Sequence, residues 1–323
     1  MKYGNVPGVG MPIARLVQGT VMVSMEDLDY AFNLLDAVFE QGCNAFDTAH
    51  VYGNGDCERA LAAWYTDRGI RDKVVVVTKG AHFNADRHRV TPFDITSDLY
   101  DSLARLKTDY IDLYLLHRDD PSVPVEPIVD VLNEHLEAGR IHAFGGSNWT
   151  HERLEQANAY ARENGLTPFA VSSPHFSLAE QIQEPWPGCV SITGPQAAAA
   201  RAWYRESEMP VFAWSSLARG FLSGQYTRQY VETFPSDTAD MSVRCYRSRD
   251  NLARLDRTFE LAKEKGLSVA QVAVAYVLNQ PLNLFALTAC RTADEIRANA
   301  EAVDVNLSEE ELAWLNLEQA GRG

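Results

Sequence analysis

The chain has 323 residues, 46% of them hydrophobic, and a formal net charge of −15 at neutral pH. This length and apolar content allow one large α/β domain or two ordinary domains with a sizeable core, and they exclude a disordered or fibrous protein. An acidic excess of this size repels phosphate backbones and anionic lipid surfaces, so we expect neither nucleic-acid binding nor membrane association.

The cysteines indicate a reducing environment. There are five, an odd number, and no two are arranged as C-x-x-C, so neither a disulfide framework nor a structural zinc site is predicted. The N-terminus lacks the basic stretch and apolar core of a secretory signal, and no apolar run approaches the roughly 20 residues of a membrane helix. We therefore expect a cytoplasmic protein.

Apolar runs of strand length alternate with amphipathic segments along the chain. We predict strands at residues 15–17, 45–46, 74–77, 111–116, 141–146, 169–171, 211–213 and 284–288. We predict helices at 27–41, 56–68, 94–107, 125–138, 151–164, 195–206, 268–280, 292–301 and 308–317. Eight strand-helix units predict an α/β fold, a closed (β/α)₈ TIM barrel that forms a single domain over residues 1–323, with an N-terminal hairpin and extra C-terminal helices.

Residues 217–249 show little periodicity. A connection of that length inside a compact domain is usually functional or mobile, so we expect a lid or a substrate loop there. Ser308 and Glu311 have the spacing of a capping box, and Gly139 is expected to end the helix before it.

Polar residues stand at the ends of the predicted strands. The loops that follow barrel strands lie on one face, so these residues should converge although they are far apart in sequence. They are Asp47, Lys79, His117, Ser147, Asn148, Ser173 and Trp214. Taken singly, each has an ordinary explanation as a turn acid, an exposed rim charge, a core histidine or part of a helix cap.

Tyr52 lies in the glycine-flanked loop that follows Asp47. A tyrosine with an ordinary pKa of about 10 is a poor proton donor or acceptor near neutrality. A neighbouring Lys79 ammonium would lower the pKa of Tyr52, and Asp47 would keep Lys79 charged and oriented. His117, across the pocket, could hydrogen-bond the oxygen of a substrate.

The segments FDTAHVYG, VVVTKG, TDYIDLYLLHRDD and FGGSN resemble the signature segments of the aldo-keto reductase superfamily. With LVQGT near the start and IRANAEAV near the end, the resemblance covers nearly the whole chain. It implies that Asp47, Tyr52, Lys79 and His117 are the catalytic residues, with Tyr52 as the general acid in carbonyl reduction.

The resemblance also implies a nicotinamide cofactor bound across the barrel mouth without a Rossmann domain. The glycines at 8–10 and 53–55 do not complete G-x-G-x-x-G and are interpreted as turns. The implied cofactor contacts are Gly19, Thr20, Asp47, Ser147, Asn148, Ser173, Trp214, Ser215, Leu217, Arg219, Arg291, Glu295 and Asn299. Ser173 is shorter than the glutamine of many members, whereas Trp214 keeps an aromatic face in place of a tyrosine.

Two residues bear on the choice between NADP(H) and NAD(H). Arg291 precedes a helix N-terminus, a position that favours a 2′-phosphate. Glu295 stands where many NADP-dependent members carry arginine or glutamine, and its carboxylate would repel that phosphate. A capping box from Thr292 to Glu295 accounts for the same residue. We favour NADP(H) and keep NAD(H) as the alternative.

The expected substrate is a small carbonyl or alcohol compound. The candidate contacts in the loops after the strands are Tyr52, His82, His117, Arg118 and Trp149. Aromatic faces beside charged donors suit a sugar-like, polyhydroxylated carbonyl compound. Solvated loops whose aromatic residues pack on the barrel explain the same pattern.

The sequence therefore predicts an NAD(P)H-dependent oxidoreductase that reduces an aldehyde or ketone, or oxidises the matching alcohol, without a metal. A metal-dependent barrel isomerase or hydrolase is one alternative, and its possible ligands would be Asp47, His82, His117, Asp119 and His175. Their spacing matches no compact ligand motif, and Lys79 would be a poor neighbour for a cation. Another alternative is a barrel that binds the cofactor for sensing or regulation, which the intact candidate catalytic set disfavours.

Overall fold

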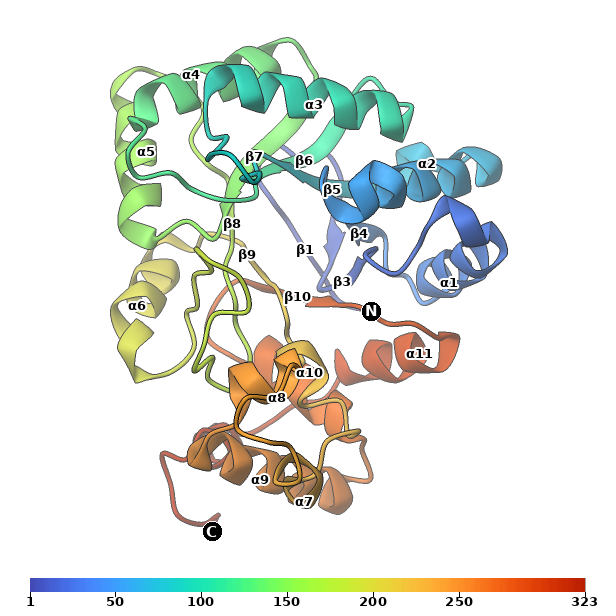
Figure 1. Ribbon diagram of the computed structural model, residues 1–323, viewed down its shortest axis with the longest axis vertical. Helices are drawn as coiled ribbons and strands as arrows, with labels where there is room; N and C mark the ends of the chain where they lie inside the picture. The colour runs from blue at the N-terminus through green and yellow to red at the C-terminus, as the bar shows by residue number, and fades with distance from the viewer. Residues whose placement is uncertain (323) are drawn as a thin grey trace.

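The structure, a computed structural model, describes residues 1–322 and has a closed barrel of parallel strands at its centre (Figure 1). The strands are β3 (Leu16–Gly19), β4 (Ala45–Asp47), β5 (Val75–Gly80), β6 (Ile111–Leu116), β7 (Ile141–Ser147), β8 (Val171–Ser173), β9 (Val211–Ala213) and β10 (Leu284–Thr288). Each pairs with the next in chain order, and β10 pairs with β3 to close the ring. The predicted α/β barrel is confirmed.

An antiparallel hairpin of β1 (Tyr3–Gly4) and β2 (Ile13–Ala14) precedes the barrel, as predicted. Val6 and Ile13 are buried in one cluster with residues of the barrel interior, such as Val75 and Ala143. The turn at Gly8 lies against the start of β7. The hairpin therefore covers the end of the barrel where the strands begin, and the opposite end carries the loops that follow the strands.

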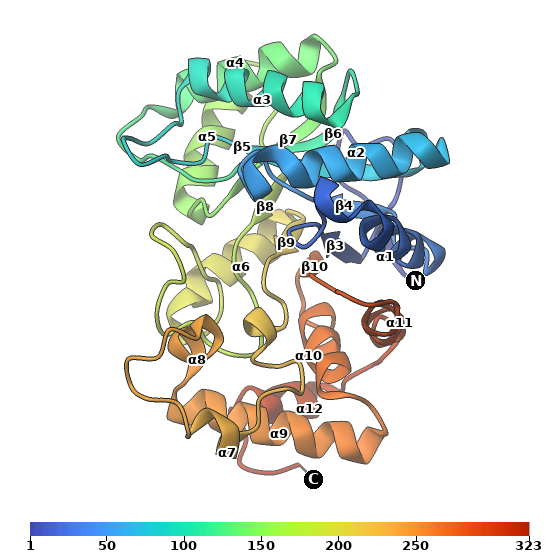
Figure 2. The same ribbon diagram turned by 45° about the vertical axis from the view of Figure 1, so that its right-hand side comes forward.

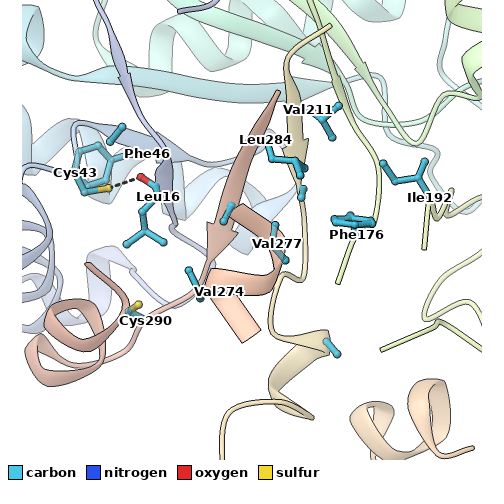
Figure 3. Close-up of a cluster of buried hydrophobic side chains, with 14 of the residues drawn as sticks. Leu16, Cys43, Phe46, Phe176, Ile192, Val211, Val274, Val277, Leu284 and Cys290 are labelled. Atoms are coloured by element: carbon cyan, nitrogen blue, oxygen red, sulfur yellow. Dashed lines mark hydrogen bonds between the residues drawn. The ribbon is translucent and has the colours of Figure 1, made fainter. Parts of the chain in front are cut away.

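Helices surround the barrel. The helices that belong to the predicted strand-helix units are α1 (Leu28–Glu40), α2 (Asp56–Arg68), α3 (Pro92–Leu106), α4 (Val125–Glu137), α5 (His151–Glu163), α6 (Ala198–Ser207) and α11 (Ala293–Ala302). Their apolar faces pack on the outside of the strands. Helix α10 (Val269–Leu278) packs in the same way, and Figure 3 shows its Val274 in one cluster with Leu284 of β10. In residues 1–322, no helix combines the length and the apolar composition that crossing a bilayer requires.

The segment at 217–249 differs from the expected irregular loop. It contains η5 (Ala218–Gly220), α7 (Arg228–Val231) and α8 (Met241–Tyr246), and Val231, Val243 and Tyr246 are buried. Periodicity missed these helices because each is too short to repeat an apolar face. The single-turn and 3₁₀ elements elsewhere are η1 (Met25–Asp27), η2 (Tyr52–Gly55), η3 (Arg71–Lys73) and η4 (Pro195–Ala197).

Helix α9 (Arg249–Lys265) was not predicted. The sequence indicates its start, because serine is favoured at helix N-caps and Leu252 and Leu255 follow Ser248 at helical spacing. In the structure Ser248 accepts a hydrogen bond from the backbone N–H of Asn251, and both leucines are buried. Figure 2 shows α9 beside α7, with α12 (Glu309–Leu315) behind it.

The expected capping box at the start of α12 is confirmed, as is the turn after α4, where Gly139 has a φ of 71°.

Several strand ends differ by a few residues from the prediction. β5 continues to Gly80 because Lys79 and Gly80 pair with Leu115 and Leu116 of β6. β8 begins later than expected and includes Ser173, which pairs with Ser147. Pairing with neighbouring strands, which the sequence does not display, sets these boundaries.

We predict that Gly145→Ala destabilises the barrel. A Cβ at Gly145 would lie 2.2 Å from the carbonyl oxygen of Val171 on the neighbouring strand, so β7 and β8 would have to separate. Overpacking of this kind costs about 1–3 kcal/mol, or more where backbone must move. Urea denaturation measures the loss. Gly10→Ala is the control, because a Cβ there has no neighbour within 4 Å. Equal stability of the two variants would contradict the register of β7 on β8.

Candidate active site

A buried ion pair joins the ends of β4 and β5. The Lys79 ammonium donates hydrogen bonds to Oδ1 of Asp47 at 2.7 Å and to the carbonyl oxygen of Thr48 at 2.8 Å, and both charged side chains are buried. Burial lowers the pKa of Lys79, but the charge of Asp47, together with hydrogen bonding to Asp47 and Tyr52, outweighs burial and raises that pKa above its usual value. Lys79 is therefore an ammonium at neutral pH, held in one position by β4.

Tyr52 stands beside this pair. It begins η2, where Gly53 and Asn54 have positive φ and turn the chain into α2. The Lys79 nitrogen lies 5.0 Å from the centroid of the Tyr52 ring. Burial raises the pKa of Tyr52, and Lys79 lowers it without reversing the shift, so the pKa remains above its usual value. Lys79 thus acts on the pKa of Tyr52 in the expected direction, although desolvation has the larger effect.

His117 faces Tyr52 from the end of β6. Its backbone N–H donates to the carbonyl oxygen of Gly80 at 2.8 Å, and its ring centroid lies 5.7 Å from that of Tyr52 and 4.8 Å from that of His82. Burial, with the charges of Lys79 and Arg118, holds the pKa of His117 well below its usual range. His117 is therefore a neutral imidazole, and its buried Nδ1 has no protein partner in residues 1–322.

The expected substrate contacts do not all lie in the rim. Trp149 is fully buried, packs on Phe169 with ring centroids 5.1 Å apart, and donates its indole N–H to the carbonyl oxygen of Arg118 at 3.2 Å. Its expected role as a substrate contact is therefore corrected to a support behind the loop. Arg118 is also buried, whereas His82 is partly exposed.

Asn148 makes contacts that sequence reasoning missed. It has a φ of 58°, and its Oδ1 accepts from the indole N–H of Trp214 at 3.2 Å and from the backbone N–H of Val190 at 3.1 Å. This holds the half-buried Trp214 ring in one orientation. The hydroxyl of Ser147 donates to the carbonyl oxygen of Ser173. Two serines, with short polar side chains, are therefore adjacent where β7 and β8 end.

Among the buried polar atoms that lack protein partners in the described chain are Oδ2 of Asp47, at the end of β4, and Nε of Arg219, whose guanidinium stacks on the ring of Trp186 at 4.7 Å. Ser215 and Arg219 have φ values of 56° and 55°, in the left-handed region. The backbone between them therefore turns sharply, a conformation that can point N–H groups at an anion. On the other side of the mouth, Thr20 donates its hydroxyl to the carbonyl oxygen of Asp47 at 3.1 Å.

The start of α11 differs from the expected capping box. Thr292 accepts from the backbone N–H of Glu295, as predicted, but the Glu295 carboxylate accepts from the N–H of Arg291 at 2.7 Å instead of that of Thr292. Asn299, on the same helix, is buried and donates to the sulfur of Cys290 at 3.1 Å.

The possible metal ligands do not assemble. His175 is fully buried, with Nδ1 bonded to the hydroxyl of Ser191 and Nε2 to that of Tyr246, and Asp119 pairs with Arg153. In the part of the chain that the structure describes, no group of three His, Cys, Asp or Glu side chains is arranged to hold a metal ion.

We predict that Asp47→Asn strongly destabilises the fold, because it leaves the buried Lys79 ammonium without its carboxylate. Removing one partner of a buried pair costs about 3–5 kcal/mol. Asp304→Asn is the matched control, since the Lys2–Asp304 pair is 3.9 Å apart and exposed on both sides, and exposed pairs contribute little. Chemical denaturation compares the two. Similar stabilities would show that the Lys79 charge does not depend on Asp47.

The sequence of this chain matches those of known proteins over nearly its whole length. A sequence model of the Aldo/keto reductase family matches residues 15–316. Aldo-keto reductase YhdN of Bacillus subtilis is 29% identical, with 98% of this chain and 93% of that protein aligned. A probable voltage-gated potassium channel subunit beta of rice, Oryza sativa subsp. japonica, is 28% identical over 94% of this chain and 92% of its own length.

Solved structures of aldo-keto reductases have the same fold as this chain. The crystal structure of an aldo-keto reductase from Klebsiella pneumoniae in complex with NADPH superposes with a TM-score of 0.74 at 23% identity, covering 98% of this chain and 95% of that one. The family match spans all eight barrel strands and every residue of the candidate site. This chain therefore belongs to the aldo/keto reductase family.

Proposed function

We propose that the protein reduces an aldehyde or ketone to the alcohol with NAD(P)H, or catalyses the reverse reaction. The observation that carries the proposal is the buried Lys79–Asp47 pair beside Tyr52, opposite a neutral His117. A protonated phenol next to a fixed ammonium is suited to give up its proton, because the ammonium stabilises the phenolate that remains. The five free and buried cysteines are compatible with a cytoplasmic location.

The residues at the mouth fit a nicotinamide dinucleotide. The half-buried Trp214 ring offers an aromatic face, Oδ2 of Asp47 can accept from a ribose hydroxyl, and Arg219 with its sharply turned backbone can receive phosphates. When bound, the reduced cofactor supplies a hydride for the carbonyl carbon. Gly19, Thr20, Ser147, Asn148 and the other residues implied by the family resemblance remain proposed contacts.

The protein's own residues handle the proton. Tyr52 donates its hydroxyl proton to the carbonyl oxygen as the carbon is reduced, so the product is the neutral alcohol. Lys79 stabilises the Tyr52 phenolate until it is reprotonated from solvent, and Asp47 keeps Lys79 in place. His117 binds the same carbonyl oxygen and orients it toward Tyr52, with an imidazole kept neutral by its surroundings.

We favour NADP(H) over NAD(H). Arg291 lies at the N-terminus of α11, where a cation and free N–H groups suit a 2′-phosphate. The Glu295 carboxylate uses the Arg291 N–H and would have to release it to a phosphate. NAD(H) is therefore the alternative, and titration with both reduced cofactors decides between them. The favoured result is tighter binding of NADPH.

A regulatory role is the second candidate, because one relative bears the name of a potassium channel subunit. Such a protein would bind the cofactor without needing rapid turnover. Tyr52, Lys79 and His117 are together in this chain, which favours the enzyme. Substrate turnover with NADPH separates the two functions.

We predict that Tyr52→Phe lowers kcat for a panel of aldehydes by about 10²–10⁴-fold, because it removes only the proton donor. NADPH binding, followed by fluorescence titration, should be largely retained. Near-normal turnover by the variant would contradict the role of Tyr52. Phe93→Tyr provides a matched control for adding or removing a phenol hydroxyl, since Phe93 is exposed on α3.

The raised pKa of Tyr52 predicts the pH dependence of both directions. Reduction needs the protonated phenol, so its kcat/KM should stay constant from about pH 6 to about pH 9, below the usual tyrosine pKa. Oxidation needs the phenolate, so its kcat/KM should rise with pH over the same range. Initial rates in both directions test this. A reductive rate that falls through neutrality would show that Tyr52 loses its proton there.

A further inference from the structure

Arg118 is a buried cation without an anionic partner. Its side chain is 5% exposed, and it forms no ion pair in residues 1–322. Nη1 donates to the carbonyl oxygen of His117 at 3.0 Å, Nη2 has only the sulfur of Cys189 at 4.0 Å, and Nε has no acceptor. Most of the hydrogen-bonding capacity of this guanidinium is therefore unused.

The two other buried arginines are compensated. Arg153 pairs with Asp119 at 3.2 Å, and Arg254 pairs with Glu180. Asp119 directly follows Arg118 in the chain, yet its carboxylate turns to Arg153. Glu184 on the facing loop is exposed and accepts from the backbone N–H of Gly188. The fold thus leaves Arg118 unpaired although carboxylates are close in sequence and in space.

The guanidinium borders the reaction site. It follows His117 directly, lies 5.9 Å from the centroid of the Phe83 ring, and is close enough for its charge to lower the pKa values of His117 and Tyr52. Burying an unpaired charge is costly, and the cost is recovered when a ligand supplies the missing anion. A planar guanidinium with free donors matches a carboxylate, which it can bind through two parallel hydrogen bonds.

We propose that Arg118 binds a carboxylate of the substrate, so that the preferred substrates are carbonyl compounds that also carry a carboxylate, such as aldehyde acids. This inference rests on the proposed reductase function and names its substrate class. It replaces the sugar-like substrate suggested by the sequence, because a neutral polyol would leave the Arg118 charge uncompensated. The protein as a whole is acidic, with a charge of −15, so the selection of an anion must be local.

Matched pairs of aldehydes test the proposal. The probes are succinic semialdehyde with methyl 4-oxobutanoate, and 4-carboxybenzaldehyde with methyl 4-formylbenzoate. The wild-type protein should have a kcat/KM at least about tenfold higher for the acid of one or both pairs, as expected for charge-assisted hydrogen bonds. Arg118→Gln should bring the acid-to-ester ratio close to one, mainly by raising KM for the acid, and Arg118→Lys should restore part of the ratio.

The controls separate binding from charge and from folding. Arg162→Gln removes an equal charge from an exposed pair with Glu155 on α5 and should leave the ratio unchanged. Arg118→Gln should not lower the melting temperature, because it removes an unpaired buried charge. A purely structural arginine would give the opposite result. An unchanged ratio in Arg118→Gln, or no preference for either acid in the wild type, would overturn the proposal.

A binding measurement keeps this test independent of turnover. Calorimetry with benzoate and benzamide, in the presence of NADPH, should show that benzoate binds more tightly and that Arg118→Gln removes the difference. Turnover of the esters without any dependence on Arg118 would leave the reductase function standing and the carboxylate site refuted. Benzoate binding that depends on Arg118, without turnover of any aldehyde, would refute the reductase function and retain the site.

Discussion

The Lys79 ammonium is buried at the end of β5, and the candidate site depends on how its charge is held. A lysine without solvent tends to lose its proton, so a buried ammonium needs fixed oxygens around it. Asp47 and the carbonyl oxygen of Thr48 provide them from the adjacent strand. Because β4 and β5 are paired within a closed ring, the backbone places these oxygens next to Lys79, and Tyr52 has a charged ammonium beside it.

The electrostatics of the site follow from two buried cations that are treated differently. Lys79 is compensated by Asp47, whereas Arg118 has no carboxylate among the described residues. Both charges, together with burial, keep His117 neutral, so it can bind an oxygen without adding a further charge. The site is therefore prepared for negative charge in two places, at the reacting oxygen beside Tyr52 and Lys79 and at Arg118. This arrangement is the basis for the proposed preference of an acidic protein for a substrate that carries a carboxylate.

Much of the fold could be predicted because a parallel barrel repeats a strong local signal. Strands buried on both faces are continuous apolar runs, and their polar ends therefore identified Asp47, Lys79 and His117 without a structure. Strand lengths were less accessible, since pairing across the ring decides where β5 and β8 end. Helix α9 could also be predicted, because Ser248 is a typical N-cap residue and Leu252 and Leu255 follow it at helical spacing.

Side-chain partners were the hardest part to predict. Sequence placed Trp149 in a rim loop, but it cannot show that the side chain turns inward onto Phe169. Likewise, it gave no sign that Asn148 fixes the Trp214 indole or that Asp119 prefers Arg153 to its neighbour Arg118. The pKa of Tyr52 depends on the balance between burial and the charges of Lys79, Asp47 and Arg118, and burial is known only once the barrel is assembled.

The proposed mechanism requires that Tyr52 holds its proton at neutral pH beside a charged Lys79. The most direct test is the NMR titration of tyrosine labelled with ¹³C at Cζ, with Tyr52→Phe used to assign the signal. We expect the Tyr52 signal to stay in the phenol position up to about pH 10, and Lys79→Met to raise the pKa of Tyr52 further. A phenolate signal at neutral pH, or a lower pKa of Tyr52 without Lys79, would contradict this mechanism.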